Sequence, residues 1–313
     1  MNNKKNKVIS LIGPTGIGKS SLAIKLQAKY PIEIISVDSA MIYRDMNIGT
    51  DKPSDKILSS IKHHLVNIRN PNESYNVGQF NSDIRIVIKN IHKNNKTPLL
   101  VGGSMMYFNS LLDGLSPLPE KNFLERKFID DLLLKYSNKQ LHFCLKDIDP
   151  LSYKNIDKHD YQRIQRALEV YICTGKPITS FFGNKIKLSD EYDLLTLKIL
   201  SKDRSLIHDK ISTRTKSMFN NNFIDEVVHT VKKYDLTADN QSMRSIGYRQ
   251  VLSYLHGNIK QKDLENRCVY ATRQLAKRQI TWLKQFNDSI VIDIAENFYK
   301  NIDEAIDNHL HFQ

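Results

Sequence analysis

The first residues that could do chemistry form a loop near the start of the chain, at positions 13–20. Two glycines five positions apart, followed by a lysine and a hydroxyl residue, match the phosphate-binding pattern G-x-x-x-x-G-K-[ST]. Backbone N–H groups of 16–19 are expected to surround phosphate oxygens, Lys19 adds positive charge, and Ser20 is a candidate Mg²⁺ ligand. We therefore predict a phosphate or diphosphate site here rather than a glycine-rich turn without a ligand. The loop consists of Gly13, Pro14, Thr15, Gly16, Ile17, Gly18, Lys19 and Ser20.

Two further polar groups follow apolar segments with strand character. Asp38 comes directly after segment 32–37, and Ser104 follows Gly102 and Gly103 after segment 98–101. In open parallel sheets ligands bind beyond the carboxyl ends of the strands, so both side chains are expected to face the phosphate loop. Asp38 could serve as a general base or could only cap the following turn. The Gly-Gly-Ser segment could approach a ligand closely or form a plain tight turn.

No apolar strand ends in the Asp of an obvious second, magnesium-binding motif of the kind typical of ATPases and GTPases. With Asp38 opposite the phosphate loop, this layout favours a transferase with a small acceptor site over a motor or a switch. A phosphotransferase remains the rival.

Basic residues gather in several segments with helical spacing. Such stripes beside an aromatic residue fit contacts with nucleic-acid phosphates and base stacking, although a solvated charged face is the alternative. The residues are Arg163 and Arg166, then Arg273, Lys277 and Lys284, then Arg244, Tyr248 and Arg249.

The elements expected to position these groups alternate between strand and helix. Short apolar segments predict strands at 8–12, 32–37, 64–68, 98–101, 194–200 and 289–294. Helical periodicity appears at 20–30 and 77–93, and alternation of this kind predicts an α/β fold with a parallel sheet, like that of phosphate-loop NTPases.

The pattern becomes helical after Pro119. We expect helices at 123–146 and 161–172, and a block of helices over 205–286 that is interrupted by a loop at 237–242. The predicted organisation is a phosphate-loop core at 1–204, in which part of 119–190 is a helical insertion. A helical portion at 205–287 follows, and the final strand and helix at 288–313 return to the core.

Composition narrows the class of protein. The chain has 313 residues, 40% hydrophobic and 26% charged, as in soluble globular proteins, and it has no apolar run near eighteen residues. The apolar stretch after the basic N-terminus is too short for a signal peptide, so we expect a cytoplasmic protein without a membrane anchor. Three distant cysteines are expected to be buried thiols. The net charge of +12 is consistent with a polyanionic partner or with compositional drift.

Taken together, these residues resemble the tRNA dimethylallyltransferase family, also called tRNA isopentenyltransferases, over nearly the whole chain. The ordered set of motifs is specific for this family, although only the first motif is diagnostic of chemistry when taken by itself. The motifs lie at 13–20, 36–43, 47–53, 99–108, 114–119, 162–170, 245–250 and 271–283.

The resemblance implies transfer of the dimethylallyl group of dimethylallyl diphosphate to N6 of adenosine 37, beside the tRNA anticodon, with release of diphosphate. The phosphate loop would hold the leaving group with Mg²⁺ on Ser20, and the implied catalytic residues are Asp38, Ser104, Lys19 and Arg126. The resemblance also implies that the helical portion at 205–287 binds tRNA. The implied tRNA-binding residues are Asp38, Ser39, Ala40, Met41, Gln162, Arg163, Ile164, Gln165, Arg166, Arg244, Ser245, Ile246, Gly247, Tyr248 and Arg249.

Two positions differ from the family pattern. Ser104 replaces a more usual Thr, and Tyr161 stands where a Pro is expected before the Gln-Arg pair. The chain ends soon after its last strand, without the zinc-finger extension of eukaryotic relatives, so we expect a bacterial-type enzyme that acts as a monomer on the anticodon stem-loop. The alternatives are a small-molecule phosphotransferase and a non-catalytic tRNA-binding protein. The sequence leaves open whether ATP occupies the loop.

Overall fold

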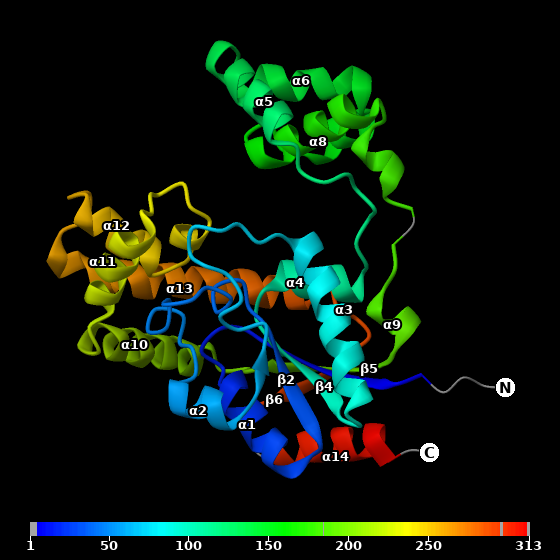
Figure 1. The fold of residues 1–313 in the computed structure, drawn as a ribbon, viewed down its shortest axis with the longest axis vertical. Helices are drawn as coiled ribbons and strands as arrows, with labels where there is room; N and C mark the ends of the chain where they lie inside the picture. The colour runs from blue at the N-terminus through cyan, green and yellow to red at the C-terminus, as the bar shows by residue number, and fades with distance from the viewer. Residues whose placement is uncertain (1–4, 184, 295–296, 312–313) are drawn as a thin grey trace. The chain divides into compact units, whose positions relative to one another are not determined.

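The computed structural model describes residues 5–183, 185–294 and 297–311, which fall into two compact units (Figure 1). The first unit combines 1–112 with 188–313, and the second is the intervening segment 113–187. The second unit thus lies within the chain of the first. The boundaries predicted at 205 and 288 stay predictions.

The first unit is built on a parallel sheet. Its strand order is β3-β2-β4-β1-β5-β6, and every neighbouring pair is parallel, with Ile9 of β1 opposite Leu99 of β4 and Leu195 of β5. This confirms the predicted α/β class. The strands are β1 Lys7–Ile12, β2 Ile32–Val37, β3 His63–His64, β4 Thr97–Gly102, β5 Asp193–Leu200 and β6 Ile290–Asp293.

The strand sequences are apolar on both faces because helices cover both. In β1, Val8 and Ile12 pack into one hydrophobic cluster, whereas Ile9 and Leu11 pack into another, as the alternation of side chains along a strand requires. Continuous apolar runs are typical of such doubly covered parallel strands.

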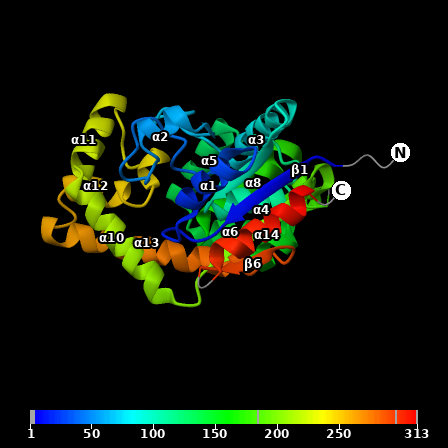
Figure 2. The ribbon, with the colours of Figure 1, turned by 90° about the horizontal axis from the view of Figure 1, so that it is seen from below.

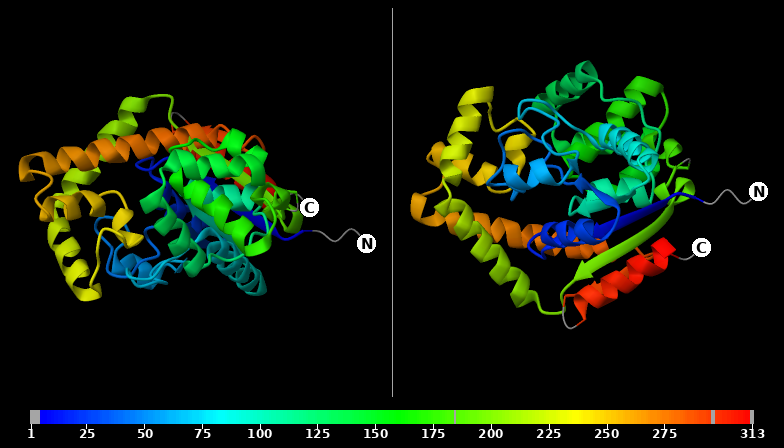
Figure 3. Two further views of the ribbon diagram at one scale, coloured as in Figure 1. Left: turned by 90° about the horizontal axis from the view of Figure 1, so that it is seen from above. Right: turned by 60° about the horizontal axis from the view of Figure 1, so that its bottom comes forward.

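Two pairs of helices lie on opposite faces of the sheet (Figures 1 and 3). Helices α3 Val77–Lys93 and α4 Met105–Leu112 join the cluster of Val8, whereas α1 Lys19–Lys29 and α14 Phe298–His311 join the cluster of Ile9. Figure 3 shows α14 alongside β5, which it contacts.

A block of helices extends the first unit beyond the sheet. It comprises α10 Arg204–Asn220, α11 Phe223–Tyr234, η2 Ser242–Arg244, α12 Tyr248–Leu255 and α13 Gln261–Leu283. Figure 2 shows α10 crossing α13, and the two helices pack against each other. Two short helices, α2 Asp55–Ser60 and α9 Leu188–Glu191, complete this unit among the described residues.

The second unit is helical and has its own core. Ile129, Leu141, Leu145, Ile164 and Val170 form a separate buried cluster. The elements are α5 Phe123–Lys135, α6 Asn138–Ile148, α7 Pro150–Asn155, α8 Tyr161–Thr174 and η1 Ile178–Phe181.

Three expectations need correction. The helix predicted at 123–146 is two helices, because Ser137 caps α6 by accepting a hydrogen bond from Gln140 N. The strand predicted at 64–68 ends at His64, because Leu65 and Asn67 adopt left-handed φ values of 60° and 56°. Of the cysteines, only Cys268 is buried, since Cys144 and Cys173 lie on exposed helix faces.

Candidate active site

A cavity of about 690 Å³ lies at the carboxyl edge of the sheet, entirely within the first unit. Segments that follow β1, β2 and β4 line it, as do residues of α10, α13 and the stretch 244–249. The structure therefore brings together the phosphate loop, Asp38 and Ser104, which the strand pattern placed at one sheet edge.

The phosphate loop connects β1 to the first turn of α1. Gly16 and Gly18 adopt φ values of 81° and 100°, which glycine reaches without strain, and Gly18 is the N-cap of α1. A Cβ at Gly13 would lie 2.7 Å from Ile199 O, so only glycine lets this loop approach β5 so closely. The N–H groups at the start of an α-helix have no partners within the helix, so the geometry of this loop is suited to an anion.

Lys19 and Ser20 both line the cavity. The Lys19 ammonium donates a hydrogen bond to Pro14 O at 2.8 Å. Burial lowers the pKa of Lys19 to about 8, opposed by the negative charge of Asp38 and assisted by the positive charge of Arg214. An anion in the cavity would favour the charged form of this lysine.

Asp38 uses one carboxylate oxygen to hold its own turn. Its Oδ1 accepts hydrogen bonds from Ala40 N at 2.8 Å and from Met41 N at 3.1 Å, which is the capping role considered from the sequence. The second oxygen makes no hydrogen bond to any residue in the described part of the chain, and Asp38 lines the cavity. The cap and the general base are thus compatible, because they need different oxygens.

Ser104 links the third segment to the second. Its Oγ accepts a hydrogen bond from Ser39 N at 2.9 Å and lies 3.2 Å from Ser39 Oγ, and its own N–H donates to Val37 O at 3.3 Å. A Cβ at Gly102 would lie 2.0 Å from Val37 O. Gly102 therefore allows this segment to pack closely against the end of β2, whereas a Cβ at Gly103 would meet Gln279 and Gly13 instead.

Among the charged residues that line the cavity, basic side chains outnumber acidic ones. Arg214 of α10, which the sequence reasoning missed, lines it and pairs with Asp51 at 3.3 Å between Nη1 and Oδ2. The spacing of Lys210 and Arg214, four residues apart on a helix, was the available signal. The basic lining residues are Lys19, Lys210, Arg214, Arg244, Arg249 and Arg278, beside Asp38 and Asp51.

The segment 244–249 contributes unequally. Arg244 and Arg249 are exposed and line the cavity, together with Ser245, Ile246 and Gly247. Tyr248 is fully buried, stacks edge-on against Phe223 and donates its hydroxyl to Glu226 Oε1 at 2.6 Å. In this conformation a base cannot stack on the Tyr248 ring.

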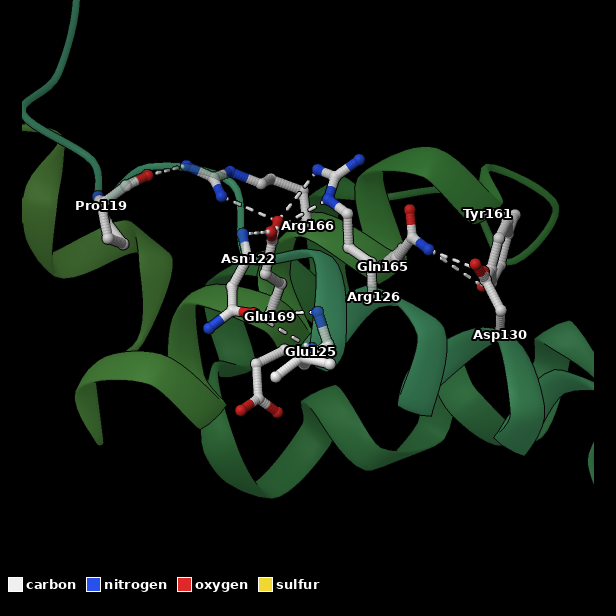
Figure 4. A network of polar contacts seen from close by, with 10 residues as sticks. Pro119, Asn122, Glu125, Arg126, Asp130, Tyr161, Gln165, Arg166 and Glu169 are labelled. Carbon is white, nitrogen blue, oxygen red and sulfur yellow. Dashed lines mark hydrogen bonds and ion pairs between the residues drawn. The ribbon is translucent and has the colours of Figure 1, made fainter. Parts of the chain in front are cut away.

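The remaining predicted residues belong to the second unit, where Arg126 and Arg166 converge on Glu169 (Figure 4). Arg126 donates from Nε and Nη2 to the two Glu169 oxygens, each at 2.9 Å. Arg166 donates to Glu169 at 2.7 Å and to Pro119 O at 2.6 Å. Burial alone would raise the pKa of Glu169, but the hydrogen bonds from the two guanidinium groups outweigh it and lower that pKa.

The rest of the stretch 162–166 divides by exposure. Gln162 and Arg163 are exposed, Ile164 is fully buried, and the Gln165 amide donates to Asp130 at 2.7 Å (Figure 4). Arg163 pairs with Asp160 at 3.2 Å at the start of α8. Within this stretch, Gln162 and Arg163 offer the most accessible side chains.

Comparison with known proteins identifies the family to which the chain belongs. The family model described as IPP transferase matches residues 41–286. A tRNA dimethylallyltransferase of Coxiella burnetii is 43% identical over 92% of each chain. One of Legionella pneumophila is 42% identical over 96% of this chain and 97% of the other.

Solved structures agree. A eukaryotic dimethylallyltransferase acting on tRNA superposes with a TM-score of 0.84 at 28% identity, over 98% of this chain and 79% of the other. The full-length tRNA isopentenylpyrophosphate transferase of Bacillus halodurans gives a TM-score of 0.68 at 28% identity, over 98% and 95%. The chain therefore belongs to the IPP transferase family, in which these relatives are named tRNA dimethylallyltransferases.

Proposed function

We propose that this enzyme transfers a dimethylallyl group from dimethylallyl diphosphate to N6 of adenosine 37 in tRNA and releases diphosphate. The observation that carries the proposal is a single basic cavity that contains both an anion-binding helix start and the free carboxylate oxygen of Asp38. The first suits a leaving diphosphate, and the second suits an amine that must lose a proton.

The leaving group would occupy the phosphate loop. As the bond between the allylic carbon and oxygen breaks, its electron pair goes to the diphosphate, and the carbon gains cationic character. The Lys19 ammonium and the N–H groups at the start of α1 would stabilise the developing negative charge. Arg214 also lines the cavity and would add positive charge, because its ion pair with Asp51 uses only part of the guanidinium group.

The acceptor would face Asp38. The N6 lone pair forms the new bond to the allylic carbon, and an N6 proton passes to the free Asp38 oxygen. Because Ala40 N and Met41 N hold the other oxygen, the carboxylate is oriented before the substrate arrives. Ser104, whose Oγ accepts a hydrogen bond from Ser39 N, would supply a second polar group beside the reacting ends.

The donor set also fits Mg²⁺. The Ser20 hydroxyl lines the cavity, and Mg²⁺ is usually held by few protein oxygens together with substrate phosphates. When bound, Mg²⁺ would neutralise part of the diphosphate charge. No group of three or more His, Cys, Asp or Glu side chains suited to a metal occurs among the described residues. The substrate would therefore have to supply most of the ligands.

The RNA substrate accounts for the remaining basic surface. The adenine must leave its stack in the anticodon loop to reach the cavity, which costs a few kcal/mol. Exposed Arg244 and Arg249 at the cavity wall suit phosphates of that loop, and exposed Gln162 and Arg163 suit contacts made by the second unit.

No described helix is long and apolar enough to cross a membrane. We further propose that the protein acts as a cytoplasmic monomer.

The test incubates the protein with dimethylallyl diphosphate, Mg²⁺ and unmodified tRNA, followed by mass analysis of the nucleosides. Prenylated adenosine is expected. Turnover of ATP with phosphorylation of a small acceptor and no prenylation would instead support a phosphotransferase. RNA binding without turnover of either kind would support a non-catalytic RNA-binding protein.

Asp38→Asn separates the two roles of Asp38. The amide oxygen can still accept from Ala40 N and Met41 N, so the turn is kept, but the side chain cannot take a proton. We expect prenyl transfer to fall by about 10²-fold or more, with tRNA affinity nearly unchanged. Asp263→Asn, at an exposed position on α13 that does not line the cavity, is the matched control. Wild-type turnover by Asp38→Asn would exclude Asp38 as the base.

A further inference from the structure

A buried amide on α13 joins two segments of the active site. Gln279 is 6% exposed. Its Oε1 accepts a hydrogen bond from Thr15 N at 2.8 Å, and its Nε2 donates one to Gly103 O at 2.7 Å. Both distances are those of good hydrogen bonds, and both partners are backbone groups of loops that line the cavity.

These two partners belong to different halves of the proposed reaction. Thr15 lies in the phosphate loop, four residues before Lys19. Gly103 directly precedes Ser104, whose Oγ holds Ser39 N, and Ser39 follows Asp38. One side chain therefore connects the loop proposed to hold the leaving diphosphate with the segment that supports the proposed base.

The packing leaves little room for adjustment. A Cβ at Gly103 would lie 2.7 Å from Gln279 Nε2 and 3.3 Å from Gly13 O, so this glycine sits directly between the amide and the phosphate loop. The site needs one acceptor and one donor on the same short group, and a carboxamide provides both. A carboxylate of the same length lacks the donor, and a methionine lacks both.

We propose that Gln279 is a positioning residue, which sets the separation between the leaving-group half and the proton-accepting half of the site. This inference rests on the proposed prenyl transfer and adds a residue outside the phosphate loop and the substrate contacts. Because a misplacement of about 1 Å can cost roughly 10²-fold in rate, loss of either hydrogen bond should slow the chemical step.

Three proteins test this under single-turnover conditions: wild type, Gln279→Met and Gln279→Glu. We expect Gln279→Met to lower the rate of prenyl transfer at least about tenfold, whereas the Kd values for inorganic diphosphate and for tRNA change less than about threefold. Gln261→Met and Gln261→Glu, at an exposed position on the same helix, are matched controls that should behave as wild type.

The pH dependence of the prenyl-transfer rate distinguishes a positioning role of Gln279 from a purely structural one. When protonated, the carboxyl group of Gln279→Glu can donate to Gly103 O and accept from Thr15 N, as the amide does. When ionised, it has no donor for Gly103 O, and burial favours the protonated form. The rate of Gln279→Glu relative to wild type should therefore rise as pH falls from 8.5 to 6, whereas that of Gln279→Met should stay constant.

The outcomes are distinct. A wild-type rate for Gln279→Met overturns the proposal, and so does an equal loss of rate, diphosphate affinity and tRNA affinity. If Gln279→Met does not fold, the pH ratio of Gln279→Glu decides alone, and a flat ratio overturns the proposal. Absence of prenylation by the wild-type enzyme would instead contradict the proposed function itself.

Discussion

Replacing Glu226 by alanine removes the acceptor for four hydrogen-bond donors at once. From α11, its Oε2 accepts from Asn47 N at 2.9 Å and from Ile48 N at 2.7 Å. Its Oε1 accepts from Gly49 N at 3.1 Å and from Tyr248 OH at 2.6 Å. The carboxylate therefore ties the loop that follows β2 to the helical block.

The loss of stability expected for Glu226→Ala depends on which of the four donors can bond to water instead. Hydrogen bonds to a charged group contribute about 1.5–3 kcal/mol each, and a buried donor left unpaired costs about 1–3 kcal/mol. Tyr248 is fully buried and Ile48 is partly covered, whereas Asn47 is exposed and can bond to water again. Since such losses do not add fully, we expect Glu226→Ala to lower the free energy of unfolding by roughly 3–4 kcal/mol. Glu226→Gln, which keeps one acceptor, should cost about half of that.

The assay is urea unfolding followed by the fluorescence of Trp282, the chain's one tryptophan, which lies on α13 in the first unit. Tyr248→Phe completes a double-mutant cycle, in which a coupling of about 1–2 kcal/mol with Glu226→Ala is expected. Glu265→Ala, exposed on α13, should stay within about 0.5 kcal/mol of wild type. A cost below about 1 kcal/mol for Glu226→Ala, or strict additivity in the cycle, would refute the reasoning.

Burial lowers the pKa of Lys19 to about 8, so its ammonium is lost as pH rises through that value. Affinity for inorganic diphosphate, measured by calorimetry, should then fall up to about tenfold per pH unit relative to Lys19→Arg, which stays charged. The pKa of Glu169 is lowered in the folded state, so its stabilisation is present above pH 4.5 and is lost as pH falls below it. The difference in unfolding free energy between wild type and Glu169→Gln should therefore shrink in acid, as circular dichroism in urea would measure. A Cβ at Gly102 would lie 2.0 Å from Val37 O, so Gly102→Ala should lower the free energy of unfolding by about 3 kcal/mol. Gly257 has a φ of 75°, but a Cβ there would meet no described atom within 4 Å, so Gly257→Ala should lower the free energy of unfolding by only about 1 kcal/mol. Thermal unfolding of the two variants measures the difference.

Local sequence predicted the sheet well, because its strands are short apolar runs bounded by turn residues. It failed at β3, where the apolar pattern of 64–68 resembles a strand but Leu65 and Asn67 adopt left-handed φ values. The break between α5 and α6 was readable, since Ser137 and Gln140 form a capping box that helical periodicity alone overlooks.

The site was predictable where its residues follow strands and unpredictable where they come from distant helices. Parallel strands end at one edge, so the strand order alone brings Asp38 and Ser104 to the phosphate loop. Helical periodicity indicates which face of α13 is buried, but it does not indicate which loop that face meets. Gln279 and Glu226 were missed for this reason, since each acts on backbone groups 176 or more residues away.

Membership of a motif also does not separate residues that face the cavity from residues that shape it. Arg244, Tyr248 and Arg249 looked alike as an arginine-rich stretch with an aromatic suited to RNA. In the structure the two arginines are exposed, whereas Tyr248 is buried and its hydroxyl donates a hydrogen bond to Glu226. Because Glu226 also holds 47–49, the helix that presents Arg249 and the loop that presents Asp51 share one anchor. A substitution at Tyr248 should therefore affect the diphosphate side of the cavity as well as its RNA side, which an RNA-stacking role would not explain.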